Sequence, residues 1–240
     1  MGKKTIKIES FSKNYSDALG YTVQIFKGIS FDIEVGKVST ILAPNGSGKS
    51  TLLKTIAGIE EDTFKTDGKR TFIPTKPSSF PWLNVSENIT FNLKNFDDNV
   101  LKNIIKFVGL EGYEDHFPNN DSVGFRFRIS LARAIINDPE LILIDESIKT
   151  ISLKRKLDLY GLLRKVSSKK GIPILYSTSS ISEAIRLSDK IIFIDQMPPK
   201  IVSTNTILID EESRMDEKNN FNISDYFTEK EISIFSNSLI

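Results

Sequence analysis

The sequence of 240 residues contains no cysteine and a single histidine, His116. The absence of cysteine excludes disulfides, thiolate zinc sites and thiol nucleophiles, and one histidine supplies too few ligands for a histidine-based metal cluster. His116 is therefore expected to be a surface residue. No apolar run approaches the ~18 residues that cross a bilayer, and the first residues lack the apolar core of a signal peptide. Any role at a membrane is expected to come through a partner.

The sequence also lacks a block of like charge. Its formal net charge is +1, and the 26% of residues that are charged are of mixed sign. Composition therefore gives no case for binding nucleic acid. Hydrophobic residues make up 39% of the chain, which is enough for a sizeable core. The length fits one large domain or a core domain with a small inserted subdomain.

Periodicity divides the chain into three parts. The first 42 residues have strand patterns, and the last of these strands, 38–42, is a short apolar strand of the kind buried in a sheet. Three helices then follow one another without strands, which predicts an inserted helical subdomain; they cover 85–93, 100–108 and 125–136. From residue 140 strands and helices alternate, and this pattern predicts a parallel sheet with covering helices.

A glycine-rich segment lies between the apolar strand 38–42 and a helix expected over 49–59. It reads Ala43-Pro44-Asn45-Gly46-Ser47-Gly48-Lys49-Ser50-Thr51. Successive backbone N–H groups at a helix N-terminus bind phosphate oxygens, and glycines allow close approach. Lys49 is expected to reach the β- and γ-phosphates, and Ser50 to offer a hydroxyl to Mg²⁺. The strict pattern has glycine where this chain has Ala43. We expect residues Asn45 to Thr51 to bind ATP or a close relative.

Two carboxylates, Asp145 and Glu146, directly follow the apolar run 141–144. The carboxyl ends of parallel strands form the edge at which open α/β folds bind ligands. Asp145 is expected to hold Mg²⁺, and Glu146 to orient or deprotonate an attacking water. An Asp-Glu pair can also be a simple helix-start signal, but the phosphate loop favours the functional interpretation.

These motifs resemble the nucleotide-binding subunits of ATP-binding cassette (ABC) transporters over roughly residues 4–205. The segment 80–89 looks like that of importer ATPases for nitrate, sulfonate and taurine. The resemblance extends to two further stretches, Leu131-Ala132-Arg133-Ala134 through Asn137-Asp138-Pro139, and Leu187-Ser188-Asp189-Lys190-Ile191. It implies a P-loop NTPase core, a mixed sheet with helices on both faces, plus an N-terminal antiparallel β region and a helical subdomain of about 80–137. It also implies that Tyr15 stacks on adenine, although Tyr15 could instead pack on the sheet.

The sequence departs from the family at several positions. The family signature aligns with Asp121-Ser122-Val123-Gly124-Phe125, where Ser122 and Gly124 match but valine replaces a glycine. A β-branched side chain at Val123 would obstruct approach to a γ-phosphate. The other degenerate positions are Thr75 for the Q-loop glutamine, Ser152 for the D-loop aspartate and Ser179 for the switch histidine. Loss of one transition-state donor often lowers the rate by ~10²–10³.

We therefore expect an ABC transporter subunit that binds Mg-ATP and hydrolyses it slowly. The resemblance implies membrane-spanning permease subunits, a second ATPase subunit (the same chain or another) and a peripheral position on the cytoplasmic face of the membrane. The alternative is a nucleotide-binding pseudo-ATPase in an asymmetric pair. A cytosolic ABC protein of translation or repair is disfavoured, because the chain has neither two cassettes nor a coiled-coil insert. Trp82 fits either a contact with the membrane subunit or the core. Residues 206–240 are expected to form an extension without an assigned function.

Overall fold

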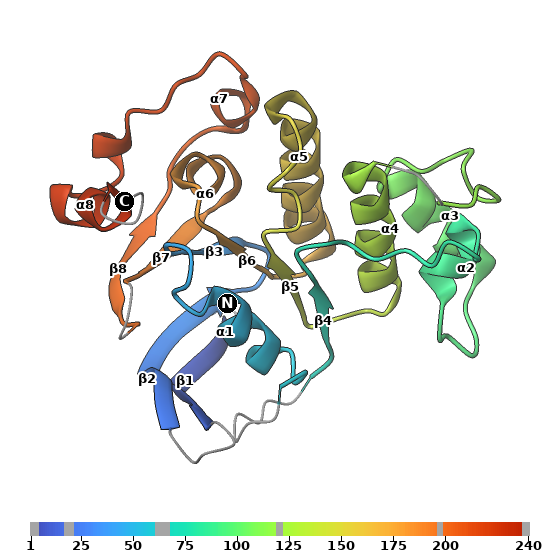
Figure 1. Cartoon of the computed structure of the whole chain (residues 1–240). Helices are drawn as coiled ribbons and strands as arrows, with labels where there is room; N and C mark the ends of the chain where they lie inside the picture. Colours follow the sequence, from blue (N-terminus) through green and yellow to red (C-terminus); the bar gives the residue numbers. More distant parts are fainter. Residues whose placement is uncertain (1–4, 17–21, 61–67, 119–121, 196–198, 237–240) are drawn as a thin grey trace.

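The computed structural model describes residues 5–16, 22–60, 68–118, 122–195 and 199–236 (Figure 1). Its centre is a six-stranded sheet whose first five strands are parallel. The spatial order is β4 (Arg70–Ile73), β5 (Leu141–Asp145), β6 (Ile174–Thr178), β3 (Val38–Leu42), β7 (Lys190–Ile194) and β8 (Ile201–Thr206). Across these described ranges, no helix is both long enough and apolar enough to cross a membrane.

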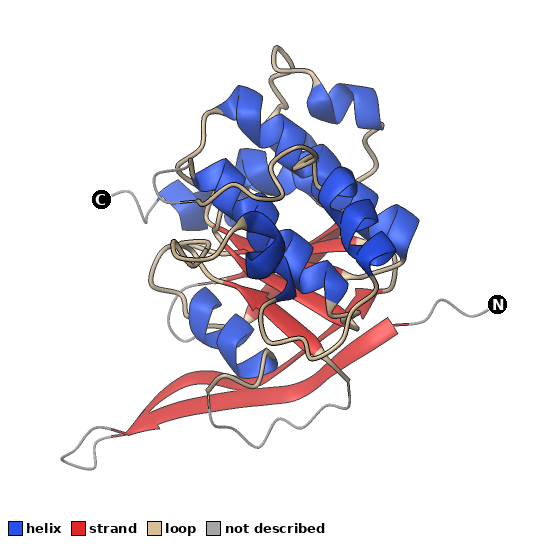
Figure 2. Cartoon of the chain, turned by 90° about the vertical axis from the view of Figure 1, so that its right-hand side faces the viewer, coloured by secondary structure: helices blue, strands red, loops and turns tan. Residues whose placement is uncertain are grey.

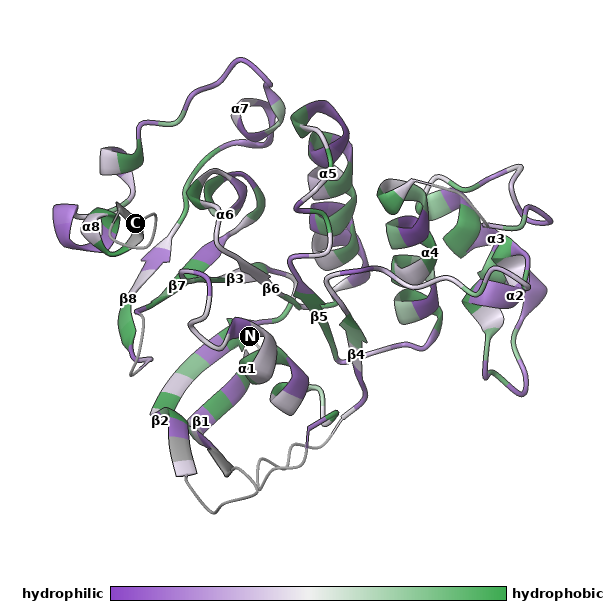
Figure 3. Ribbon diagram, viewed as in Figure 1, coloured by the Kyte–Doolittle hydropathy of each residue, from purple (hydrophilic) through white to green (hydrophobic). Residues whose placement is uncertain are grey.

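The central strands are covered on both faces, so they are mostly apolar, and the polar residues Ser39 and Thr40 of β3 are buried with the rest. Every residue of β3 and β5 is buried. Figure 3 shows hydrophobic colouring along β4 and β5, in contrast to the alternation along the two N-terminal strands. This explains why the short apolar runs 38–42 and 141–144 predicted strands correctly.

The register of the sheet decides where the functional residues lie. Leu42, the last residue of β3, pairs with Thr178 of β6, and Asp145 at the end of β5 pairs with Ser177. The loop after β3 and the carboxylates after β5 therefore emerge at the same edge of the sheet.

The two N-terminal strands, β1 (Thr5–Ser16) and β2 (Thr22–Glu34), form a separate antiparallel ribbon. Helix α1 (Lys49–Ile56) shares one core cluster with this ribbon and the central sheet. Its contribution is the apolar face Leu52, Leu53 and Ile56, all fully buried. Figure 2 shows the ribbon running along the side of the molecule opposite most of the helices. The predicted N-terminal antiparallel region is confirmed.

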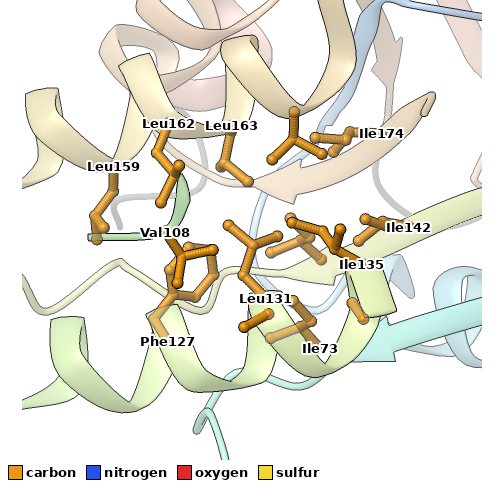
Figure 4. Close-up of a cluster of buried hydrophobic side chains, with 14 of the residues drawn as sticks. Ile73, Val108, Phe127, Leu131, Ile135, Ile142, Leu159, Leu162, Leu163 and Ile174 are labelled. Atoms are coloured by element: carbon orange, nitrogen blue, oxygen red, sulfur yellow. The ribbon is translucent and has the colours of Figure 1, made fainter. Parts of the chain in front are cut away.

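The run of helices predicted after the loop is also present. It consists of α2 (Val85–Thr90), α3 (Asp98–Phe107) and α4 (Val123–Ile136), which lie together at one side of Figure 1. Asn84 caps α2 with a complete capping box. Helix α4 joins this group to the sheet, because Leu131 and Ile135 pack in the same cluster as Ile142 and Ile174 (Figure 4).

The remaining helices cover the sheet and its last strand. They are α5 (Leu153–Lys170), α6 (Ile181–Leu187), α7 (Glu211–Met215), the 3₁₀ turn Ile223–Asp225 and α8 (Glu229–Ser236). The alternation of strands and helices predicted from residue 140 agrees with α5 and α6, whereas β8 and α7 were not predicted. Strand β8 pairs antiparallel with β7 and carries serine, threonine and asparagine, so its pattern is too polar to predict a sheet strand.

Candidate functional site

The loop after β3 has the geometry of an anion cradle. Gly46 and Gly48 have φ of 77° and 86°, a conformation that favours glycine. A Cβ on Gly48 would also meet Ile25 and Phe26 at 3.0 Å. Helix α1 begins at Lys49, so its free N–H groups face the loop. A cavity of about 370 Å³ opens here, lined by Ile25, Asn45, Gly46, Gly48, Lys49, Ser50, Thr51 and Glu146.

Lys49 lies almost wholly inside this cradle, with 7% of its side chain exposed. Its Nζ donates to the carbonyls of Ala43 and Pro44 at 3.0 and 2.9 Å. It also lies 3.4 Å from Glu146 Oε1. Burial lowers the pKa of Lys49, while the nearby negative charge of Glu146 acts in the opposite direction. The lysine is thus a buried cation at the mouth of the loop.

Asp145 is surrounded by hydroxyl donors. Ser50 Oγ and Thr75 Oγ1 donate to Oδ2 at 2.7 and 3.0 Å, and Ser177 Oγ donates to Oδ1 at 2.7 Å. Ser177 was not predicted from the sequence, because only the pairing of β5 with β6 brings it to this carboxylate. Carboxylate and hydroxyl oxygens are hard ligands of the kind that Mg²⁺ prefers. In the part of the chain that is described, no group of three His, Cys, Asp or Glu side chains offers a competing metal site.

Glu146 stands between two lysines. Its Oε1 lies 3.4 Å from Lys49 Nζ, and its Oε2 accepts a hydrogen bond of 3.0 Å from Lys149 Nζ. Partial burial alone would raise the pKa of Glu146, but the hydrogen bond from Lys149 and the charges of both lysines hold it below its usual value. The backbone of Glu146 has φ of 45°, a strained value for a residue other than glycine. Such strain is common where a side chain must be aimed.

A second cavity, of about 530 Å³, adjoins the first and shares Glu146 with it. Its other lining residues come mainly from the segment after β4 and the start of α4, and they include Thr75, Lys76, Ser78, Val123, Arg126 and Lys149. Val123 is therefore placed at a cavity next to Glu146. Lys149 was missed by the sequence analysis, because nothing in the pattern Ile148-Lys149-Thr150 distinguishes it from a surface lysine.

The other degenerate positions lie at element ends. Ser122 caps α4, its Oγ accepting from Phe125 N at 3.3 Å, and Gly124 falls in the first turn of that helix. Ser152 precedes α5 as its N-cap residue. Ser179 follows β6 and accepts a hydrogen bond of 3.3 Å from Lys149. The structure thus brings Thr75, Val123 and Ser179 around the Glu146 region.

The structure does not describe the side chains of two residues singled out in the sequence, Tyr15 and Asp121. Tyr15 is in β1 opposite Val23, but its side chain is outside the described part, so the adenine stacking stays a prediction. Asp121 also lies outside the described residues.

Trp82 and His116 can be placed. The indole of Trp82 is 69% exposed, so the core interpretation is wrong. His116 is exposed as expected, and its ring packs edge-on against Tyr113 and Phe125.

Comparisons with known proteins agree with this geometry. A family model described as "ABC transporter" matches residues 26–149. The aliphatic sulfonates import ATP-binding protein SsuB of Bacillus cereus is 35% identical over 211 residues, covering 82% of this chain and 84% of the relative. An uncharacterized ABC transporter ATP-binding protein of Methanocaldococcus jannaschii is 32% identical over 216 residues, covering 83% and 80%.

A solved structure supports the fold. A dimeric ATP-binding cassette, in a post-hydrolysis state with ADP and phosphate, superimposes with a TM-score of 0.71 at 22% identity. The match covers 86% of this chain and all of that one. With a glycine loop, a buried lysine and two carboxylates at one edge of an ABC-type sheet, the chain belongs to the ABC transporter family as an ATP-hydrolysing, ATP-binding subunit.

Proposed function

We propose that this chain powers an ABC importer, coupling the binding and slow hydrolysis of Mg-ATP to transport through separate membrane-spanning subunits. The observation that carries the proposal is the convergence of Lys49, Asp145 and Glu146 on the phosphate cavity. The import direction is supported by the names of the sulfonate importer relatives. This function places the chain on the cytoplasmic face of a membrane through its partners. Residues 1–205 would form the nucleotide-binding domain and 206–240 an extension.

Binding of ATP would use groups that are already in place. Backbone N–H groups of residues 45–51 converge on the cradle, where helix α1 presents its positive end. Lys49 would exchange the carbonyls of Ala43 and Pro44 for oxygens of the β- and γ-phosphates. This exchange replaces two neutral acceptors with charged ones, which form stronger hydrogen bonds.

The residues around Asp145 fit Mg²⁺ in their chemistry. Ser50 and Asp145 offer a hydroxyl and a carboxylate 2.7 Å apart, so an ion held by both would take the place of their hydrogen bond, with the hydroxyl keeping its proton. Bound there, Mg²⁺ would offset charge on the β- and γ-phosphate oxygens. Thr75 and Ser177 would keep the carboxylate of Asp145 oriented.

Glu146 would accept a hydrogen bond from the attacking water and take its proton as the water oxygen bonds to the γ-phosphorus. The bond from that phosphorus to the bridging oxygen breaks, and the oxygen leaves with ADP. Slow turnover follows from what surrounds it. Thr75 is too short to reach a water near the γ-phosphate while its hydroxyl donates to Asp145. Ser179 offers a neutral hydroxyl, and Val123 lacks the free backbone approach of glycine. The intact set of Lys49, Asp145 and Glu146 favours this slow ATPase over the pseudo-ATPase alternative.

Assembly would complete the site. Neither Ser122 nor Val123 lines the phosphate cavity itself, so we expect a second ATPase subunit to bring its signature region against the loop. Toward the membrane subunit, the exposed Trp82 stacks with Phe80, which in turn packs on Phe91 at a ring distance of 4.4 Å. This aromatic patch on the helical subdomain is our candidate contact.

Phosphate release by the purified chain tests the proposal. With saturating Mg-ATP we expect turnover on the order of 0.1 per second or slower, below the usual enzyme range because transition-state donors are missing. Glu146→Gln should lower this rate by at least about 100-fold while ATP still binds. Turnover of many per second that Glu146→Gln abolishes would contradict slow hydrolysis. A rate unaffected by Glu146→Gln would contradict the assignment of the site.

A further inference from the structure

We propose that Lys149 is a positioning residue for Glu146, holding one carboxylate oxygen so that the other is left for the attacking water. This inference rests on the proposed function and assigns a role to a side chain that the motifs do not include. Lys149, Glu146 and the phosphate loop all belong to one chain, so the proposed role needs no residue of a partner subunit.

The two oxygens of Glu146 have different surroundings. Oε2 accepts a hydrogen bond of 3.0 Å from Lys149. Oε1 is buried and has no hydrogen-bond partner, although Lys49 Nζ lies 3.4 Å away. A buried oxygen with unused lone pairs is costly unless something donates to it. Glu146 also lines the phosphate cavity, so a water beside the terminal phosphate is the donor that fits Oε1.

Lys149 is itself fixed at two points. It lies in the turn after β5, where its backbone N–H donates to Glu146 O at 3.1 Å. Its ammonium bonds Glu146 and, at 3.3 Å, Ser179 Oγ from the loop after β6. The lysine therefore joins the ends of two neighbouring strands across the carboxylate. The positive charge of Lys149 therefore lies beside Ser179, whose own side chain is a neutral hydroxyl.

The charge balance explains why such an anchor is needed. Without nucleotide, Glu146 has an ammonium on each side, Lys49 and Lys149. When ATP enters, Lys49 is drawn to the phosphate oxygens, and a carboxylate that is only 13% exposed would face a strongly anionic group. Lys149 remains as its counter-ion. Without Lys149, repulsion by the phosphates would turn Glu146 away from the water.

The test uses three variants of the full chain. Lys149→Met removes the ammonium and keeps the length of the side chain, and Lys149→Arg keeps a cation. Lys165→Met is the matched control, because Lys165 is exposed on α5, lines neither of the two cavities and is in none of the ion pairs of Glu146. Steady-state phosphate release gives kcat and KM, an equilibrium titration gives the Kd for ATP, and thermal unfolding monitors the fold.

We expect Lys149→Met to lower kcat by about 10- to 100-fold and to change KM and Kd by less than about threefold, since Lys149 acts on the water through Glu146 rather than on ATP. Lys149→Arg should recover kcat to within about threefold of wild type, and Lys165→Met should match wild type. A merely structural role would move the unfolding temperature or Kd instead.

Several results would overturn the inference. An unchanged kcat in Lys149→Met would show that Lys149 is not needed to position Glu146. A raised kcat would show that Lys149 inhibits hydrolysis. A loss that Lys149→Arg does not recover would contradict a role for the cation. Failure of the proposed function would look different from failure of this inference. The wild-type protein would then release no phosphate, or Glu146→Gln would leave its rate of phosphate release unchanged.

Discussion

Replacement of Lys49 by methionine is expected to weaken ATP binding by about 30- to 5,000-fold. Removing one partner of a buried, hydrogen-bonded charge pair costs about 2–5 kcal/mol, which corresponds to this range. Lys49 would be such a buried partner for the phosphates, because its side chain is 7% exposed and its ammonium is held at the mouth of the phosphate cavity. Equilibrium titration with ATP in excess Mg²⁺ measures the change.

The control for this experiment is Lys54→Met on the same helix. Lys54 lies in the last turn of α1, away from the phosphate cavity, and its loss should leave the ATP affinity within about threefold. A Lys49→Met protein that is folded and binds ATP as tightly as wild type would mean that the loop does not hold the phosphates.

Replacement of Arg214 by methionine is expected to lower the free energy of unfolding by about 3 kcal/mol or more. The guanidinium is 1% exposed. It donates to five backbone carbonyls, those of Ile185, Arg186, Ser188, Ile207 and Ile209. Methionine would leave these buried acceptors without their donor, and each unsatisfied group costs about 1–3 kcal/mol before relaxation. Burial lowers the pKa of Arg214 to about 10, so it stays charged at neutral pH.

Chemical denaturation of both proteins measures this loss, and the exposed Arg155 on α5 provides a matched Arg155→Met control. The control should change the unfolding free energy by less than about 0.5 kcal/mol. A comparably small change in Arg214→Met would mean that these hydrogen bonds to α6 and to the segment after β8 contribute little to stability.

The parts of this protein that were predictable share a local cause. The phosphate loop is recognisable because Gly46, Gly48 and Lys49 must occur at fixed spacing between a buried strand and a helix. Asp145 and Glu146 are recognisable because they end an apolar run that only a covered sheet strand explains. In both cases a short segment carries its own physical requirement.

The parts that were not predictable depend on contacts between distant segments. Ser177 has ordinary neighbours in the sequence, and only the pairing of β5 with β6 brings it to Asp145. The same pairing brings Ser179 to Lys149, which contacts Glu146 from three residues along the chain. Strand β8 is polar because it lies at the edge of the sheet. Arg214 reads as a surface arginine on a short helix, yet it reaches 29 residues back along the chain to the carbonyl of Ile185.

The central claim is that the loop from Ala43 to Thr51 holds Mg-ATP together with Asp145. Calorimetric titration of the wild-type chain with ATP, in Mg²⁺ and again in EDTA, tests it most directly. We predict saturable binding of one ATP per chain in Mg²⁺ and an affinity at least about tenfold lower in EDTA, because the metal offsets phosphate charge beside Asp145. No saturable binding up to millimolar ATP, or equal affinity with and without Mg²⁺, would contradict the claim.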